Sequence, residues 1–128
     1  MCAVQRRALS MKWMRPLIVC ATLGAAASPS VAAQAGEELF LACSACHSAA
    51  EDALGPNLQG IIGRASAARD DFRYSPAMQR AGIVWTEENL RSFLLDPQGF
   101  IRGNRMPFSG FSNPADADAI IAYLKSLQ

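Results

Sequence analysis

The chain has 128 residues, a length that suits one domain, and 51% of them are hydrophobic. Its 12 basic and 11 acidic residues nearly balance. The sequence therefore lacks the strong positive charge that is typical of nucleic-acid-binding proteins.

Residues 1–35 have the three parts of a secretory signal peptide. A basic start without acidic residues is followed by an uncharged apolar run over 17–27. Small residues then offer cleavage after Ala33 or Ala35, and cleavage after Ala27 stays open. The apolar run is too short to span a bilayer, which takes roughly 20 residues. We therefore predict an exported protein with one domain over 36–128.

Removal of the signal peptide changes the charge. Four of the twelve basic residues precede residue 36 and no acidic residue does, which leaves eight basic and eleven acidic residues and a net charge of −3. Only one lysine, Lys125, remains in the domain. About 93 residues bury a small core, so a buried cofactor would add apolar surface to fold around.

The first part of the domain combines one short helix with long loops. Residues 36–42 predict a helix with Glu37 and Glu38 in its first turn, where carboxylates are favourable against the helix dipole. Residues 48–73 are rich in Gly, Ala and polar residues and predict loops. We find no internal repeat and no low-complexity tract.

The second part predicts three further helices. Ser75-Pro76 begins a short helix that ends at Gly82. Thr86 caps a helix over 87–95, which Asp96-Pro97 ends. Residues 98–112 predict a loop.

Asn113-Pro114 begins the last helix, and one face of it is apolar at the spacing of an amphipathic helix: Ile120, Tyr123, Leu124 and Leu127. Since no convincing strand is present, the predicted fold class is all-α. Loops of this length are unusual in a compact domain unless they are functional, and here they could wrap a cofactor.

The run Cys43-Ser44-Ala45-Cys46-His47 has the pattern of a covalent haem attachment site. Each thiol of such a motif adds to one haem vinyl group, and the histidine becomes an axial ligand of the iron. His47 is the only histidine in the chain, which excludes a bis-histidine haem within one protomer. Zinc is disfavoured because a structural zinc site needs about four Cys or His ligands, and the domain offers three. A thioredoxin-like motif would need a βαβ context, which is absent.

The second axial ligand must come from elsewhere in the domain, which contains two methionines. Met78 lies inside a predicted helix, and we interpret it as core filling. Met106 lies in a loop next to Pro107, which restricts Met106 to extended geometry, and a glycine precedes it at Gly103. We therefore predict a His47/Met106 pair, in which the thioether raises the reduction potential. Two protein ligands leave no open iron position and favour electron transfer.

The order of these motifs resembles the class I cytochromes c, in the small soluble c2-like or mitochondrial-like group. The resemblance covers roughly 36–127. It rests on the haem motif and on the following segments: Gly36 with Phe40, Gly55-Pro56-Asn57-Leu58, Gly63-Arg64, Tyr74-Ser75, Gly82-Ile83-Val84-Trp85, Leu90 with Leu94, Asp96-Pro97, Met106-Pro107-Phe108 and Ile121-Ala122-Tyr123-Leu124.

The resemblance implies one covalent haem c and a role for each of several residues. Gly36 and Phe40 would let the first helix cross close to Tyr123. The Pro56 carbonyl would accept the His47 ring proton that faces away from the iron. Haem propionates would be bound by three side chains: Arg64, Tyr74 and Trp85. Arg64 could instead lie on a solvated face, and Trp85 could be an ordinary core residue.

Three departures from the family pattern bear on function. Phe93 stands where many relatives carry a tyrosine that can bond the ligand sulfur, and Asn104 stands where threonine is frequent. The ring of docking lysines is missing, which leaves Arg102 and Arg105 as candidates for contact with an acidic partner.

These observations favour a periplasmic, monomeric one-electron carrier that is not an enzyme. Its partners would be other redox proteins: a membrane donor complex and a terminal acceptor. Small residues near the haem edge, around Ala42 and Ala45, would meet these partners transiently. A fixed cytochrome subunit of a dehydrogenase or oxidase is the alternative, and a haem-based ligand sensor or an enzyme with an open iron position is a weaker one.

Overall fold

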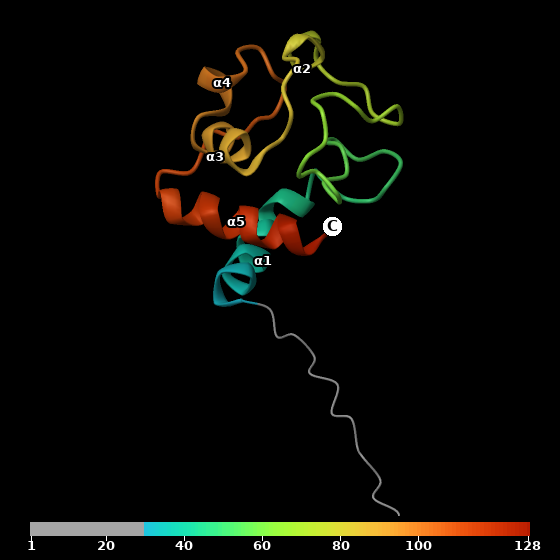
Figure 1. Cartoon of the computed structure of the whole chain (residues 1–128). Helices are drawn as coiled ribbons and strands as arrows, with labels where there is room; N and C mark the ends of the chain where they lie inside the picture. The colour runs from blue at the N-terminus through green and yellow to red at the C-terminus, as the bar shows by residue number, and fades with distance from the viewer. Residues whose placement is uncertain (1–29) are drawn as a thin grey trace, which may run out of the picture.

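The computed structural model describes residues 30–128, and the regular structure of this range is helical (Figure 1). The helices are α1 (Val31–Ser44), α2 (Pro76–Arg80), α3 (Glu87–Leu95), α4 (Pro97–Phe100) and α5 (Pro114–Ser126). Strand pairing in residues 30–128 is limited to one isolated bridge between Ala65 and Val84. The all-α prediction is therefore confirmed. Most of the predicted signal peptide, residues 1–29, lies outside the described residues.

Helix α1 begins five residues before the predicted start. The Ser30 hydroxyl accepts a hydrogen bond from the Ala33 N–H at 3.2 Å and caps the helix. Alanines, which have the highest helix propensity, follow this cap. Glu37 and Glu38 therefore lie beyond the first turn, and the argument that they oppose the helix dipole there was wrong.

Helices α1 and α5 cross at the base of the molecule (Figure 1). A Cβ atom on Gly36 would overlap the main-chain carbonyl of Ala119 and lie 2.8 Å from the Tyr123 Cβ, so only glycine permits this approach. One turn further on, the rings of Phe40 and Tyr123 pack with their centroids 5.1 Å apart. The predicted close crossing is confirmed, and it fixes the end of α1 from which the cysteine motif continues.

The capping residues account for the other helix bounds. Thr86 accepts from the Asn89 N–H at 3.1 Å, and α3 spans the predicted range. Asp96 ends α3 but also caps α4 by accepting from the Gly99 N–H at 2.8 Å. The predicted loop over 98–112 was therefore wrong in its first three residues, because Asp96-Pro97 both stops one helix and starts another.

The ends of the remaining helices differ little from the predictions. Helix α2 starts after the predicted cap Ser75 but ends at Arg80, before Gly82, which has a φ of 59°. Helix α5 starts after the predicted cap Asn113. None of the helices between residues 30 and 128 combines the length and apolar character needed to cross a bilayer.

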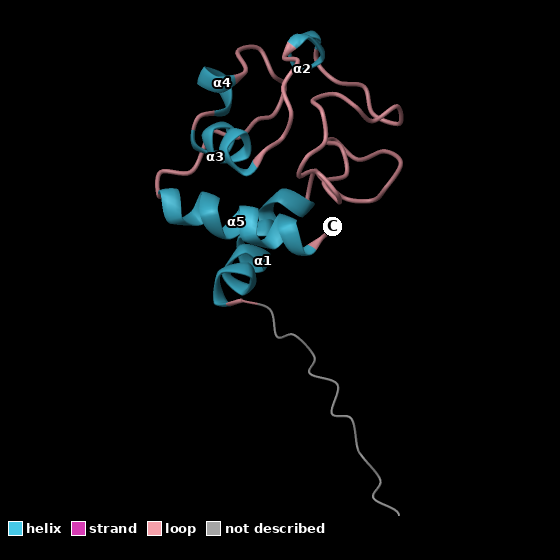
Figure 2. Ribbon diagram, viewed as in Figure 1, coloured by secondary structure: helices cyan, strands magenta, loops and turns pink. Residues whose placement is uncertain are grey.

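The core is built from side chains of α3, α5 and the loops around them, and Figure 2 shows how these helices and loops are arranged. It is a single cluster of buried side chains: Ile61, Trp85, Leu90, Phe93, Leu94, Ile101, Ala117, Ile120, Ile121 and Leu124. Half-buried residues pack against it, among them Cys43 from α1 and Leu58 and Met106 from the loops. The core thus brings the end of α1 and the loop after α4 toward the same apolar cluster.

Candidate haem site

The cysteine motif continues the last turn of α1. The N–H groups of Cys46 and His47 donate to the Cys43 carbonyl at 3.1 and 2.9 Å. Because Cys43 and His47 are four residues apart in helical geometry, their side chains leave the chain on the same side. Both cysteines are free thiols and half-buried, and burial raises the pKa of the Cys43 thiol.

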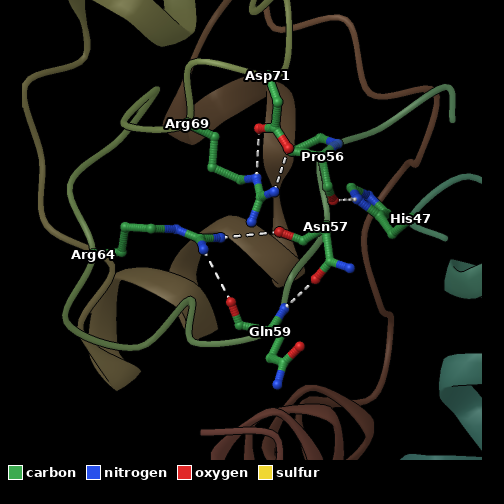
Figure 3. A network of polar contacts seen from close by, with 7 residues as sticks. All are labelled: His47, Pro56, Asn57, Gln59, Arg64, Arg69 and Asp71. Atoms are coloured by element: carbon green, nitrogen blue, oxygen red, sulfur yellow. Dashed lines mark hydrogen bonds and ion pairs between the residues drawn. The ribbon is translucent and has the colours of Figure 1, made fainter. Parts of the chain in front are cut away.

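The His47 ring is held by one main-chain carbonyl. Its Nδ1 lies 2.7 Å from the Pro56 oxygen (Figure 3). A carbonyl only accepts, so Nδ1 carries the proton and Nε2 keeps its lone pair for a metal. This is the contact that the resemblance implied for Pro56.

Gly55 lies against the His47 ring. A Cβ atom on Gly55 would come within 2.7 Å of His47 Cε1, and the Gly55 N–H donates to the Cys46 carbonyl at 2.9 Å. The loop over 48–54 therefore closes directly on the haem motif. From the sequence, Gly55 was predicted only as part of the family pattern. Because Gly55 directly precedes Pro56, the predicted partner of His47, its position in the sequence already indicated that it lies beside the histidine ring.

Arg64 and Trp85 lie next to each other across two paired segments. The Trp85 N–H donates to the Arg64 carbonyl at 2.8 Å, and the Gly63 N–H donates to the Trp85 carbonyl at 2.9 Å. The Arg64 guanidinium donates to the carbonyls of Gln59 and Asn57 at 2.9 and 3.1 Å (Figure 3). The Trp85 ring is buried against the edge of Phe93, with the ring centroids 5.1 Å apart.

Tyr74 completes the set of predicted propionate ligands. Burial raises the pKa of the Tyr74 phenol, and the charge of Arg64 opposes this shift. Burial also lowers the pKa of the Arg64 guanidinium, with Tyr74 opposing that change. Both groups are partly removed from water, and a cation in such surroundings gains from an anionic partner.

Arg69 is a second cation beside this cluster, and it was not among the predicted site residues. Its guanidinium forms a two-pronged ion pair with Asp71 (Figure 3). The hydrogen bond between them raises the pKa of Arg69 and lowers the pKa of the Asp71 carboxyl. No sequence pattern distinguishes Arg69 from the other exposed arginines, so only the folded loop identifies it.

Asn104 organises the loop that carries Met106. Its Oδ1 accepts from the Met106 N–H at 2.9 Å, while its Nδ2 donates to the carbonyls of Pro97 and Ile101 at 2.7 and 2.9 Å. The sequence alone does not predict these partners of Asn104. The Met106 side chain is half-buried and packs against the core. Met78 also packs there, from α2, as a core-filling residue does.

The donor set fits a haem attached through two thioethers. Two unpaired, half-buried thiols precede a histidine whose Nε2 is available, and the Met106 thioether packs on the same core. These residues and the all-helical fold define the class: a small c-type haem protein.

Comparisons with known proteins give the same class. The family model described as "Cytochrome c" matches residues 33–128. Cytochrome c2 iso-2 of Magnetospirillum fulvum is 46% identical over 90 residues, which cover 69% of this chain and 94% of that protein. Cytochrome c2 of Agrobacterium tumefaciens (strain II Chrys) is 47% identical over 95 residues, covering 70% and 86%.

A solved structure, cytochrome cH from Methylobacterium extorquens, matches with a TM-score of 0.70 and 38% identity, over 73% of this chain and 97% of that one. The chain belongs to the cytochrome c family. It is a cytochrome c2-like electron carrier, and membership of this family implies a covalent haem c at Cys43 and Cys46.

Proposed function

We propose that this chain is a periplasmic one-electron carrier whose single haem c has His47 and Met106 as axial ligands. The observation that carries the proposal is the hydrogen bond from His47 Nδ1 to the Pro56 carbonyl, at 2.7 Å. It fixes the ring and leaves Nε2 as the donor toward the iron. The protein shuttles electrons and has no substrate of its own.

The haem, when bound, supplies the Fe(II)/Fe(III) couple. Met106 adds a soft sulfur ligand that favours the reduced iron and raises the potential. Asn104 holds the Met106 main chain through a hydrogen bond of 2.9 Å from the Met106 N–H. Phe93 has no hydroxyl to offer to the sulfur, which leaves that ligand with one polar neighbour fewer than in relatives with tyrosine.

Arg64, Tyr74 and Trp85 bind the propionates in this proposal. Arg64 and Trp85 are joined through their main chains, and Tyr74 lies close to the Arg64 charge. Two guanidinium N–H groups of Arg64 already donate to carbonyls. A guanidinium has five donors in all, so Arg64 keeps donors for a carboxylate.

The periplasm is the proposed location because residues 1–35 have the pattern of a cleaved signal peptide. The proposed partners are a membrane donor complex and a terminal acceptor. Arg102 and Arg105 are both exposed near the Met106 loop and are candidates for contact with an acidic partner. We propose that the protein acts as a monomer that docks briefly with each partner.

The absorption spectrum of the oxidised holoprotein tests the ligand pair. A His/Met haem has a weak sulfur-to-iron band near the red end of the visible range, and Met106→Ala should abolish it. Met78→Ala is the matched control and should keep the band. Retention of the band in Met106→Ala, or rapid carbon monoxide binding by the unmodified reduced protein, would contradict the proposal and favour an open iron position.

A further inference from the structure

The loop that carries Met106 is tied to the rest of the protein at both ends, and in Figure 1 it is the orange segment between α4 and α5. Beyond Met106, the Phe111 N–H donates to the Leu94 carbonyl at 2.9 Å, which fastens the far end of the loop to α3. Before Met106, the chain turns directly after α4, and Gly103 has a φ of 85°. Side-chain hydrogen bonds hold this nearer end.

Gln98, in α4, makes two side-chain hydrogen bonds to the turn before Met106. Its Nε2 donates to the Asn104 carbonyl at 3.1 Å, and its Oε1 accepts from the Gly103 N–H at 3.3 Å. Within residues 30–128, neither of these two main-chain groups has another hydrogen-bond partner. A carboxamide carries both a donor and an acceptor, so one glutamine serves both groups at once.

Asn104 makes the opposite connection. Its Nδ2 donates to the Pro97 carbonyl at 2.7 Å, and its Oδ1 accepts from the Met106 N–H at 2.9 Å. The Gln98 side chain thus bonds the main chain at Asn104, while the Asn104 side chain bonds the main chain next to Gln98. We call these two residues the amide clamp. Because Pro97 is fully buried, the α4 side of the amide clamp is anchored in the core.

The two residues of the amide clamp differ in exposure. Asn104 is buried, whereas Gln98 and Gly103 lie at the surface. Water can therefore compete for the hydrogen bonds of Gln98, and solvent-exposed hydrogen bonds with few buried contacts mark the segments that open most easily. Opening of the amide clamp should start at Gln98 and should free the main chain two residues before Met106.

We propose that Gln98 is a positioning residue for the iron ligand and that it sets how often the Met106 sulfur leaves the iron. Gln98 acts through Asn104, because it holds the Asn104 carbonyl while the Asn104 side chain holds the Met106 N–H. The inference rests on the proposed function, in which Met106 is the second axial ligand. A sulfur that leaves rarely keeps the iron closed to external ligands, which suits an electron carrier.

Imidazole binding by the oxidised holoprotein measures this opening. Imidazole can bind the iron only after the sulfur has left, so the stopped-flow rate levels off, at high imidazole concentration, at the rate of sulfur release. Gln98→Leu keeps the size of the side chain and removes both hydrogen bonds. It should raise the limiting rate by roughly three- to tenfold, the effect expected for the loss of solvent-exposed hydrogen bonds.

The matched control is Gln128→Leu. The Gln128 Nε2 also donates to a main-chain carbonyl, that of Leu124 at 3.3 Å, but it lies at the end of α5, outside the ligand loop. This variant should leave the limiting rate unchanged. Equal limiting rates in Gln98→Leu and Gln128→Leu would overturn the proposal.

A double-variant cycle tests whether Gln98 acts through Asn104. Asn104→Ala should raise the limiting rate by itself. Because residues of one hydrogen-bond network are coupled, the combination with Gln98→Leu should raise the rate by less than the product of the two single effects. Effects that multiply in full would contradict the route through Asn104.

Hydrogen exchange gives a readout that does not depend on the iron ligand. In the reduced holoprotein, followed by NMR, Gln98→Leu should speed exchange at the Gly103 and Met106 amides. It should leave the Phe111 amide unchanged, because the bond to the Leu94 carbonyl remains. Equal acceleration at all three amides would indicate a general loss of stability and contradict a positioning role.

Failure of the proposed ligand pair has a different signature. It would appear with Gln98 intact, as a sulfur-to-iron band that survives Met106→Ala. Failure of the positioning role would appear only on replacement of Gln98, as an unchanged limiting rate and unchanged exchange at Met106. The two failures are therefore distinguishable.

Discussion

Replacement of Asn104 should loosen the Met106 ligand, because the Asn104 side chain holds the Met106 main chain. The Asn104 side chain is 7% exposed and makes three hydrogen bonds, at 2.7, 2.9 and 2.9 Å. In Asn104→Ala the carbonyls of Pro97 and Ile101 each keep one main-chain donor. The Met106 N–H instead loses the side-chain acceptor that holds it.

The magnitude follows from these partners. The two carbonyl bonds contribute about 1 kcal/mol each, and loss of the acceptor of the part-buried Met106 N–H costs about 1 kcal/mol more, so the free energy of unfolding should fall by about 3 kcal/mol. For a domain of this size that loss lowers the melting temperature by roughly 12–24 °C. Because the lost bonds belong to the ligand loop, the sulfur-to-iron band should weaken in the folded protein, well below the melting temperature.

Two further variants separate the loss of these hydrogen bonds from a loss of packing and from a general loss of stability. Asn104→Leu keeps most of the volume but none of the hydrogen bonds, so it should behave like Asn104→Ala. Asn113→Ala removes another asparagine that bonds the main chain, at the start of α5. It should cost about 1 kcal/mol as a lost helix cap and leave the band unchanged. A stable Asn104→Leu protein with a full band would show that Asn104 acts by packing alone.

Three other changes test the fold, each by thermal unfolding followed with circular dichroism. Gly36→Ala would place a Cβ atom against the Ala119 main-chain carbonyl and 2.8 Å from the Tyr123 Cβ. Because backbone within α5 would have to move, we expect overpacking of about 3 kcal/mol or more, offset by about 1 kcal/mol of helix propensity. The melting temperature should fall, and an increase would refute the tight crossing. Ala67 has a φ of 54°, and Ala67→Gly should raise stability by about 1 kcal/mol, whereas a loss would show that its methyl group packs usefully. Burial raises the pKa of Tyr74 above its ordinary 10.0. The folded protein therefore keeps the phenol proton at a pH where the unfolded chain has lost it, and the free energy of unfolding falls as the pH rises from about 10 through the raised pKa. Tyr74→Phe should flatten this loss above about pH 10, and an unchanged slope there would exclude Tyr74 as its source.

Much of the fold could be predicted because its helix boundaries are local. Thr86 and Asn113 are capping residues followed by helix formers, and both helices start where the caps predict. The predicted start of α1 was wrong because its cap, Ser30, lies in a segment that also has the composition of a signal-cleavage region. The helix α4 was missed because Asp96-Pro97 was interpreted only as a stop.

The site could be predicted where ligands are adjacent in sequence and not where they depend on tertiary structure. Cys43, Cys46 and His47 follow from one motif of five residues. The partners of Asn104 are main-chain groups brought to it by the turn after α4, and no side-chain pattern encodes them. The pair of Arg69 and Asp71 likewise forms because the loop folds back on itself.

The two proposed iron ligands are held in physically different ways, and this difference predicts which side of the haem opens first. His47 continues a fourteen-residue helix that is locked against α5, and its ring is fixed between Gly55 and the Pro56 carbonyl. Met106 lies in a loop without helical hydrogen bonds, where one buried asparagine holds its N–H. Fewer and more local contacts mean a lower free energy of local opening. Partial unfolding should therefore release Met106 while His47 stays bound, so a ligand-binding form of this protein would arise on the methionine side.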